Sequence, residues 1–161
     1  EKDPERIQKL VKWTVQIKLD HVQEDVREKG IRLHLNYGHT IGQSIEMATG
    51  TGNEIYRHGE AVCLGMMAVA FLADHYYDDG LDRAGIHRQL LEAFHLPFSI
   101  DMSQIAVDLP TLEGMVYENL KKDKKRIAAG LRFVLVPQLG SAKTVTGIEE
   151  IMIRAAIKSL F

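Results

Sequence analysis

The chain has 161 residues, a formal net charge of −2 and 45% hydrophobic residues, which is the composition of an ordinary globular domain. The near-neutral charge excludes a general attraction to nucleic acid or to anionic membranes. The single cysteine, Cys63, excludes an internal disulfide and is compatible with a reducing cytosol. The charged N-terminal residues and the short apolar stretch at residues 61–73 predict neither a signal peptide nor a membrane span. We therefore expect a cytoplasmic protein without nucleic-acid or membrane partners.

The N-terminal part of the sequence predicts three helices. Asp3-Pro4 is typical of a helix start, and apolar residues at steps of three or four then predict a long amphipathic helix that ends near Lys29-Gly30. A second helix is expected at residues 39–48 and a loop at residues 49–57. A very apolar third helix is expected at residues 58–77, and its small residues indicate close helix packing.

The C-terminal part predicts three more helices and a hairpin. Asp78-Asp79-Gly80 breaks the third helix, and helices are expected at residues 82–95 and 111–122. Residues 131–137 and 142–145 predict two short paired strands. Thr146 and Glu149 form a capping-box pattern for a last helix. The predicted fold class is therefore mainly α: a single helical domain over residues 1–161 with one small β-hairpin near residues 131–146.

Two short segments carry residues suited to chemistry. His39, within the segment 36–43 (Asn-Tyr-Gly-His-Thr-Ile-Gly-Gln), and His58, within the segment 58–61 (His-Gly-Glu-Ala), each stand beside a glycine at a predicted helix start. Glycine allows close approach of a ligand, and a helix N-terminus favours anions such as phosphate. Two neutral imidazoles brought together would make half of a zinc site. The alternative is that each histidine only caps its helix or faces solvent, since the spacing is not the His-Glu-x-x-His pattern.

Further polar residues occur in a defined order along nearly the whole chain. They are Lys18, Asp25, Glu28 and Gly30; then Arg32, Asn36 and Tyr37-Gly38-His39-Thr40-Ile41-Gly42; then His58-Gly59-Glu60-Ala61-Val62 with Gly65-Met66; and last Asp123-Lys124-Lys125 with Gly130. This order resembles the signature of the 3-dehydroquinate synthase family of sugar-phosphate cyclases, in the C-terminal domain only.

The resemblance implies a helical C-terminal domain from a two-domain enzyme, with the N-terminal NAD-binding domain absent from this chain. The family converts 3-deoxy-arabino-heptulosonate 7-phosphate into 3-dehydroquinate with release of phosphate, in the shikimate pathway of aromatic amino-acid biosynthesis. It uses NAD and a divalent metal, zinc or cobalt. We therefore expect a phosphorus–oxygen lyase in the full-length protein and an anionic sugar phosphate as substrate. Because no glycine-rich dinucleotide motif follows a strand here, we expect no turnover by this chain alone.

The resemblance also implies roles for individual residues. It gives His39 and His58 as two of three zinc ligands, the third being a glutamate upstream of this chain. It gives four substrate-contacting residues, which are Lys18, Glu28, Arg32 and Asn36. Lys125, alone or with Lys124, corresponds to a lysine near the substrate carboxylate, although the basic run at residues 121–126 is equally typical of a solvated surface.

One position departs from the family pattern. The family has a second histidine four residues after His39, where this chain has Gln43. Glutamine forms hydrogen bonds but does not carry a proton at neutral pH. Three alternatives therefore stay open: a related cyclase with a different carbocyclic product, a metal-dependent polyol dehydrogenase relative, and a degenerate non-catalytic helical module. A homodimer, formed through an apolar face that the missing domain leaves exposed, is also kept open.

Overall fold

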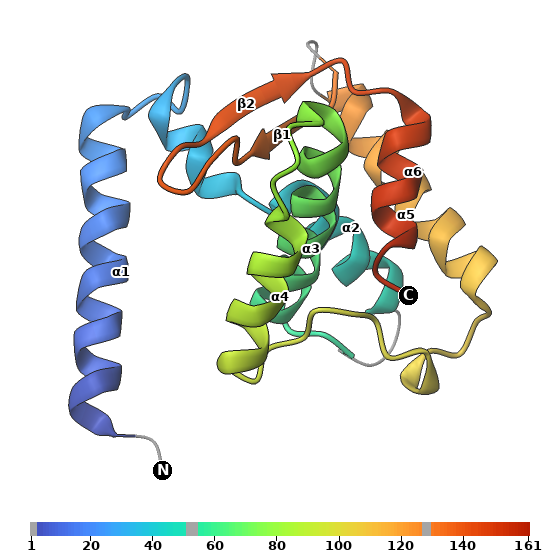
Figure 1. The fold of residues 1–161 in the computed structure, drawn as a ribbon, viewed down its shortest axis with the longest axis horizontal. Helices are drawn as coiled ribbons and strands as arrows, with labels where there is room; N and C mark the ends of the chain where they lie inside the picture. The colour runs from blue at the N-terminus through green and yellow to red at the C-terminus, as the bar shows by residue number, and fades with distance from the viewer. Residues whose placement is uncertain (1–2, 51–54, 127–129) are drawn as a thin grey trace. The chain divides into compact units, whose positions relative to one another are not determined.

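The computed structural model describes residues 3–50, 55–126 and 130–161, without the side chains of residues 123–126. The backbone divides into two units, residues 1–36 and residues 37–161, and each is described by itself. Figure 1 shows the elements of both units in chain order, from α1 in blue to α6 in red. The predicted fold class is confirmed, since the described residues form helices and one small antiparallel hairpin. That residues 1–161 act as one domain stays a prediction.

The first unit holds α1 (Pro4–Glu24) and the 3₁₀ helix η1 (Ile31–Asn36). Asp3 caps α1 as predicted, because its carboxylate accepts the N–H of Glu5 at 3.0 Å. The predicted end near Lys29-Gly30 is wrong, since the helix ends at Glu24. The Asp25 carboxylate accepts the N–H groups of Lys29 and Gly30, which a continuing helix would have directed to backbone carbonyls.

The second unit contains the remaining elements. They are α2 (His39–Thr49), α3 (His58–Tyr77), α4 (Arg83–Ala93), η2 (Met102–Gln104), α5 (Leu109–Arg126), β1 (Arg132–Leu135), β2 (Lys143–Thr146) and α6 (Glu150–Lys158). The helices predicted at residues 39–48, 58–77 and 82–95 are confirmed to within two residues, and α5 extends beyond its predicted range at both ends. Residues 51–54 of the predicted loop lie outside the described residues.

Helix α3 forms the centre of the second unit, and Figure 1 shows it in green beside α2, α4 and α6. Its contacts with α2, α4, α6 and β1 bury an apolar core that includes Leu64, Leu72, Ile41, Phe133 and Ile157. Each such side chain contributes about 1.5–3 kcal/mol relative to exposure. This packing explains why α3 is apolar around its whole circumference.

The hairpin and the last helix meet at residues 146–149. Strands β1 and β2 pair antiparallel, with Arg132 opposite Thr146. The predicted capping box of Thr146 and Glu149 is wrong, because Thr146 is the last residue of β2 and Glu149 itself is the N-cap of α6, without a side-chain hydrogen bond. The local pattern was therefore overridden by strand pairing.

A buried arginine joins α3, α4 and the end of the hairpin strand β1. The Arg83 side chain is 4% exposed and binds the carboxylates of Asp74 and Asp79 and the carbonyls of Val136 and Pro137. The hydrogen bonds from Arg83 lower the pKa of Asp79 from 3.8 to about 2. Ionised Asp79 therefore stabilises the folded chain above its unfolded pKa, and this stabilisation is lost as the pH falls through the folded pKa.

We expect Asp79→Asn to lower the melting temperature at neutral pH, because it removes the charge that pairs with Arg83. The difference between wild type and variant should shrink as the pH falls from about 4 to about 2, where the wild-type carboxylate becomes protonated. Thermal unfolding followed by circular dichroism across this pH range measures the melting temperatures of wild type and variant and the difference between them. A difference that stays constant down to pH 2 would contradict the assigned ion pair.

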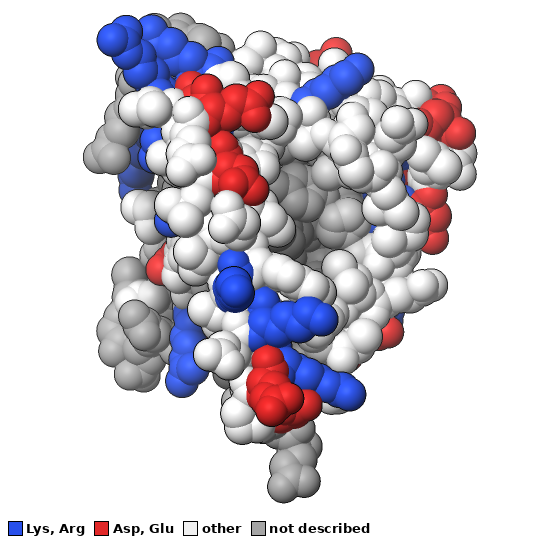
Figure 2. Space-filling model, turned by 90° about the vertical axis from the view of Figure 1, so that its left-hand side faces the viewer, with Lys and Arg blue, Asp and Glu red and all other residues white. Residues whose placement is uncertain are grey.

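The surface shows charges of both signs. On the face drawn in Figure 2, basic and acidic side chains are interspersed among uncharged ones.

Among the described residues, no helix combines the length and apolar character that a membrane crossing requires. Several apolar side chains of α1 are about half exposed, namely Ile7, Leu10, Val11, Trp13, Val15, Ile17 and Leu19. The predicted exposed apolar face and the homodimer nevertheless stay predictions.

Candidate functional site

Three glycines set the distance between α2 and α3. The helices run antiparallel, so that Glu46 of α2 meets His58 at the start of α3, whereas Gly38 at the start of α2 meets Met66. A Cβ atom on Gly65 would overlap the carbonyl oxygen of Gly38, and a Cβ atom on Gly42 would lie 2.7 Å from the carbonyl oxygen of Ala61. The backbones therefore touch, and the side chains beside this contact are held close together.

The close packing brings the two predicted metal ligands together. The rings of His39 and His58 lie 5.4 Å apart between centroids, at an interplanar angle of 60°. His39 is half-buried and His58 is exposed. The start of α2 is also tied to its neighbours, because Thr40 donates its hydroxyl to the Arg132 carbonyl at 2.9 Å and the Tyr37 hydroxyl bonds His87 at 2.8 Å. The fold therefore places His39 beside His58.

Hydrogen bonds define which ring nitrogens remain available. Nδ1 of His39 lies 3.2 Å from the Tyr37 carbonyl oxygen, and Nδ1 of His58 lies 2.8 Å from Oε2 of Glu46. A carbonyl or an ionised carboxylate can only accept, so each Nδ1 carries the hydrogen. In a neutral imidazole this leaves Nε2 with its lone pair. Both histidines thus offer Nε2 as a metal-binding atom.

This donor set fits part of a zinc or cobalt site. Catalytic zinc is held by three protein ligands, and imidazole nitrogen is among the preferred types. Within the described residues, no group of three or more His, Cys, Asp or Glu side chains is placed to hold a metal ion. That His39 and His58 supply two of the ligands of a metal ion therefore stays a prediction.

Gln43 and Glu46 share a face of α2 with His39. The positions 39, 43 and 46 follow one another at steps of four and three, which places them on one side of a helix. Gln43 is exposed one turn after His39. Sequence reasoning singled out Gln43 but missed Glu46. Its spacing of seven residues from His39 was a signal for the shared face, although nothing local indicated that this face meets His58.

Three of the five predicted substrate residues meet within residues 1–36. Nδ2 of Asn36 donates to Oε1 of Glu28 at 2.9 Å, and Nε of Arg32 lies 3.9 Å from Oε2 of Glu28. Glu28 has a positive φ of 52°, which is uncommon for a residue with a side chain. The carboxylate of Glu28 thus holds the amide of Asn36 by a hydrogen bond and forms an ion pair with the guanidinium of Arg32. Amide and guanidinium groups are suited to binding carboxylate, phosphate and hydroxyl oxygens.

The other two predicted substrate residues are less well defined. Lys18 is exposed on α1. Lys125 belongs to α5, but its side chain, like that of Lys124, lies outside the described residues. The binding roles of Lys18, Glu28, Arg32, Asn36 and Lys125 all stay predictions.

Asp25 holds the turn that carries Glu28 and Arg32. Its carboxylate accepts the N–H groups of Lys29 at 3.1 Å, Gly30 at 2.6 Å and Arg32 at 3.3 Å. These bonds lower the pKa of the Asp25 carboxyl, with that from Lys29 the largest contribution. Asp25 was part of the sequence pattern without a role, and the structure gives it one: it fixes the backbone of the turn.

We expect Asp25→Ala to lower kcat/KM by about tenfold to a hundredfold in a complete enzyme, because misplacement of substrate-binding groups is costly. The affinity for Co²⁺ should not change, since Asp25 is not one of the proposed metal ligands and its carboxylate binds the backbone of its own turn. Steady-state kinetics and a Co²⁺ titration test the two statements. An unchanged kcat/KM would show that the turn does not need this carboxylate.

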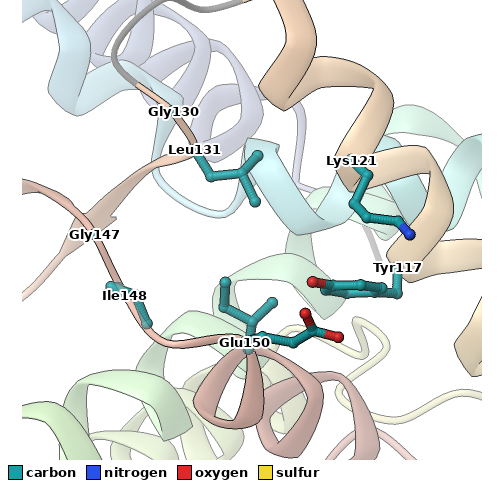
Figure 3. Close-up of a pocket in the computed structure, with 8 residues that line it drawn as sticks. Tyr117, Lys121, Gly130, Leu131, Gly147, Ile148 and Glu150 are labelled. Carbon is teal, nitrogen blue, oxygen red and sulfur yellow. The ribbon is translucent and has the colours of Figure 1, made fainter.

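A separate cavity of about 360 Å³ lies between α5, α6 and the hairpin. Figure 3 shows the Tyr117 ring and the Glu150 carboxylate side by side, with Lys121 above them and Leu131 and Ile148 across the cavity. Burial and the hydrogen bond to Glu150 raise the pKa of Tyr117. Of the predicted site residues whose side chains are described, none lines this cavity. It is therefore distinct from the histidine pair.

Known proteins with similar sequences cover most of this chain. The model of the 3-dehydroquinate synthase C-terminal family matches residues 1–126. A 3-dehydroquinate synthase from Streptococcus pneumoniae is 38% identical over 141 residues, which are 86% of this chain and 36% of that protein. One from Geobacter metallireducens is 37% identical over 145 residues, 89% of this chain and 37% of that protein. The chain thus spans little more than a third of the length of these curated relatives.

Solved structures show the same fold at lower identity. A 2-deoxy-scyllo-inosose synthase in complex with carbaglucose-6-phosphate, NAD⁺ and Co²⁺ aligns with a TM-score of 0.74 at 22% identity, over 99% of this chain and 42% of its own. A 2-epi-5-epi-valiolone synthase from Streptomyces hygroscopicus subsp. jinggangensis, with NAD⁺ and Zn²⁺ bound, also aligns with a TM-score of 0.74 at 22% identity, over 98% of this chain and 41% of its own. With the fold in agreement and the family model matching residues 1–126, the chain belongs to the 3-dehydroquinate synthase family, as its C-terminal part.

Proposed function

We propose that this chain is the metal- and substrate-binding half of a lyase that converts a heptulosonate 7-phosphate into 3-dehydroquinate with release of phosphate. The observation that carries the proposal is the pair of His39 and His58, whose Nε2 atoms are both left available for a metal. Membership of the 3-dehydroquinate synthase family supports the choice of reaction. The proposal places the activity in the complete polypeptide, because the chain covers 36% of its first relative.

In this proposal His39 and His58 hold a divalent ion together with a third ligand from outside the chain. The ion, when bound, acts as a Lewis acid toward substrate oxygens. Zinc or cobalt is supported by the ions in the two related cyclases of the same fold. The chain itself supplies the orientation of the two imidazoles, through the Tyr37 carbonyl and the Glu46 carboxylate.

The residues around η1 hold the anionic substrate in this proposal. Arg32 pairs with a carboxylate or phosphate, and Glu28 and Asn36 bind hydroxyl groups. Lys18 and Lys125 add positive charge at further substrate oxygens. Preorganisation supports these roles, since one hydrogen bond joins Asn36 to Glu28 and an ion pair joins Arg32 to Glu28. In this proposal NAD is bound mainly by an N-terminal domain outside this chain, and the NAD⁺ in the related cyclases supports NAD as the cofactor.

A second candidate is a cyclase with a different carbocyclic product. The observation that favours it is Gln43, exposed one turn after His39 on the face that carries Glu46. An amide at this position cannot transfer a proton at neutral pH, so the route by which phosphate leaves would differ. The two solved cyclases of the same fold carry the names of other ring products, which supports the same alternative.

Phosphate release tests the proposal. We expect the complete two-domain protein, with NAD and Zn²⁺ or Co²⁺, to release inorganic phosphate from the heptulosonate phosphate, and the 161-residue chain alone to release none. Release by the chain alone would contradict the assignment of hydride transfer to the missing domain. A folded, metal-loaded protein that releases phosphate only from another sugar phosphate would favour the second candidate.

A further inference from the structure

We infer that Glu46 is a positioning residue for the metal site, which holds the ring of His58 so that its Nε2 points toward the ion. The inference rests on the proposed function, because it assigns a role toward the metal of the same site. It concerns a residue that the sequence motif did not single out, and its basis is the 2.8 Å hydrogen bond between Nδ1 of His58 and Oε2 of Glu46.

The His58 ring needs such a partner. His58 is the first residue of α3, and 56% of its side chain is exposed, so that packing restrains the ring only weakly. The ring of His39 contacts it on one side, with 5.4 Å between the centroids. A carboxylate on Nδ1 fixes both the tautomer and the rotation of the imidazole, and it makes the other ring nitrogen a stronger ligand.

The backbone holds Glu46 in place for this role. Glu46 lies on the well-packed helix α2, where its neighbours Ile45 and Ala48 are buried in the core. The antiparallel contact of α2 with α3 then brings residue 46 opposite residue 58, as the glycine contacts at residues 42 and 65 require. The carboxylate thus comes from a rigid element, and the same helix also carries the other ligand, His39.

Two other roles for Glu46 fit the geometry less well. As a direct metal ligand, Glu46 would have to lie on the Nε2 side of His58, whereas its oxygen lies at Nδ1. As a plain surface ion pair, it would stabilise the fold only slightly, since 38% of the Glu46 side chain is exposed. A positioning role predicts a large effect on metal affinity together with a small effect on stability.

The test is a titration of the complete metal-free protein with Co²⁺, followed by visible absorption. We expect Glu46→Ala to weaken Co²⁺ binding by about tenfold to a hundredfold, which is typical of lost outer partners of metal-binding histidines. We expect Glu46→Gln to weaken it less, because the amide oxygen still accepts the Nδ1–H of His58. The melting temperature of the metal-free protein should move by no more than about 3 °C in either variant.

Glu92→Ala is the matched control. It removes one carboxylate from α4, where Glu92 pairs with Arg88 at 3.2 Å, and therefore changes the net charge equally. Glu92→Ala should bind Co²⁺ like the wild type. Equal Co²⁺ affinity for wild type, Glu46→Ala and Glu92→Ala would overturn the inference.

The Co²⁺ spectrum at saturation separates positioning from ligation. With Glu46 as a positioning residue, saturated Glu46→Ala shows the wild-type absorption bands, because the ligand atoms are unchanged. A change in band energy and intensity would mean that Glu46 is itself a ligand, and this would overturn the inference. A wild type that binds no Co²⁺ would overturn it as well.

Failure of the proposed function gives a different result. In that case the wild-type protein binds Co²⁺ but releases no phosphate from the heptulosonate phosphate. The affinity ratio between wild type and Glu46→Ala still decides the role of Glu46 in that case, since the titration does not depend on turnover.

Discussion

Gly65→Ala should destabilise the protein by about 3 kcal/mol, the upper part of the range for overpacked cores. The new Cβ atom would overlap the Gly38 carbonyl oxygen and lie 2.7 Å from the Gly42 nitrogen. Both are backbone atoms of α2 or its cap, so no side chain can rotate away to make room. Helices α2 and α3 would have to separate, and the contact between the rings of His39 and His58 would be lost. Chemical denaturation of the 161-residue chain measures the free energy of unfolding.

Gly114→Ala provides the control for this prediction. Gly114 lies in α5, and a Cβ atom there meets nothing within 4 Å. Alanine is a better helix former than glycine by about 1 kcal/mol, so Gly114→Ala should stabilise the chain. The same substitution should thus lower the free energy of unfolding at residue 65 and raise it at residue 114. A Gly65→Ala variant as stable as wild type would contradict the close contact of α2 with α3.

His58→Ala should weaken Co²⁺ binding by more than the roughly hundredfold expected for the loss of an outer partner, because it removes one of the proposed ligands. Phosphate release by the complete protein should fall in parallel at limiting metal, since the ion assists the chemistry. Stability of the metal-free protein should change little, because His58 is exposed at the start of α3. Equilibrium titration and a phosphate assay on the same preparation test both statements.

His75→Ala is the matched control for His58→Ala. His75 is also an exposed histidine of α3, and its Nδ1 bonds the Phe71 carbonyl of the same helix at 2.9 Å. Its loss should leave Co²⁺ affinity unchanged. If His58→Ala and His75→Ala bind Co²⁺ equally well, the histidine pair is not the metal site.

The helices of the second unit were predictable because their signals are local. Gly38 precedes the start of α2, and Asp78-Asp79-Gly80 follows the end of α3. The apolar run between His58 and Tyr77 is too long for a strand and therefore predicted a helix. The end of α1 was not predictable in this way. It depends on the Asp25 side chain, which captures N–H groups up to seven residues later in the chain. The capping box failed because the pairing of Thr146 with Arg132 is a non-local contact.

Only the part of the site that lies in short sequence motifs was predictable. The segments around His39 and His58 indicated two histidines at helix starts, and the structure places their rings together. Glu46 was not predicted, because its partner is twelve residues away across a helix pair and only the antiparallel packing brings the two together. The sequence likewise indicated Glu28, Arg32 and Asn36 without showing that Glu28 binds Asn36 and pairs with Arg32.

The ring product of the complete enzyme decides whether this family member forms 3-dehydroquinate. With NAD, Zn²⁺ and the heptulosonate phosphate, we expect one 3-dehydroquinate for each phosphate released. Both products should be lost after treatment with a chelator and restored by Zn²⁺ or Co²⁺. Mass spectrometry of the product alongside a phosphate assay provides this measurement. A folded, metal-loaded enzyme that forms no 3-dehydroquinate would contradict the proposed function, and Gln43→His would then be the first variant to examine.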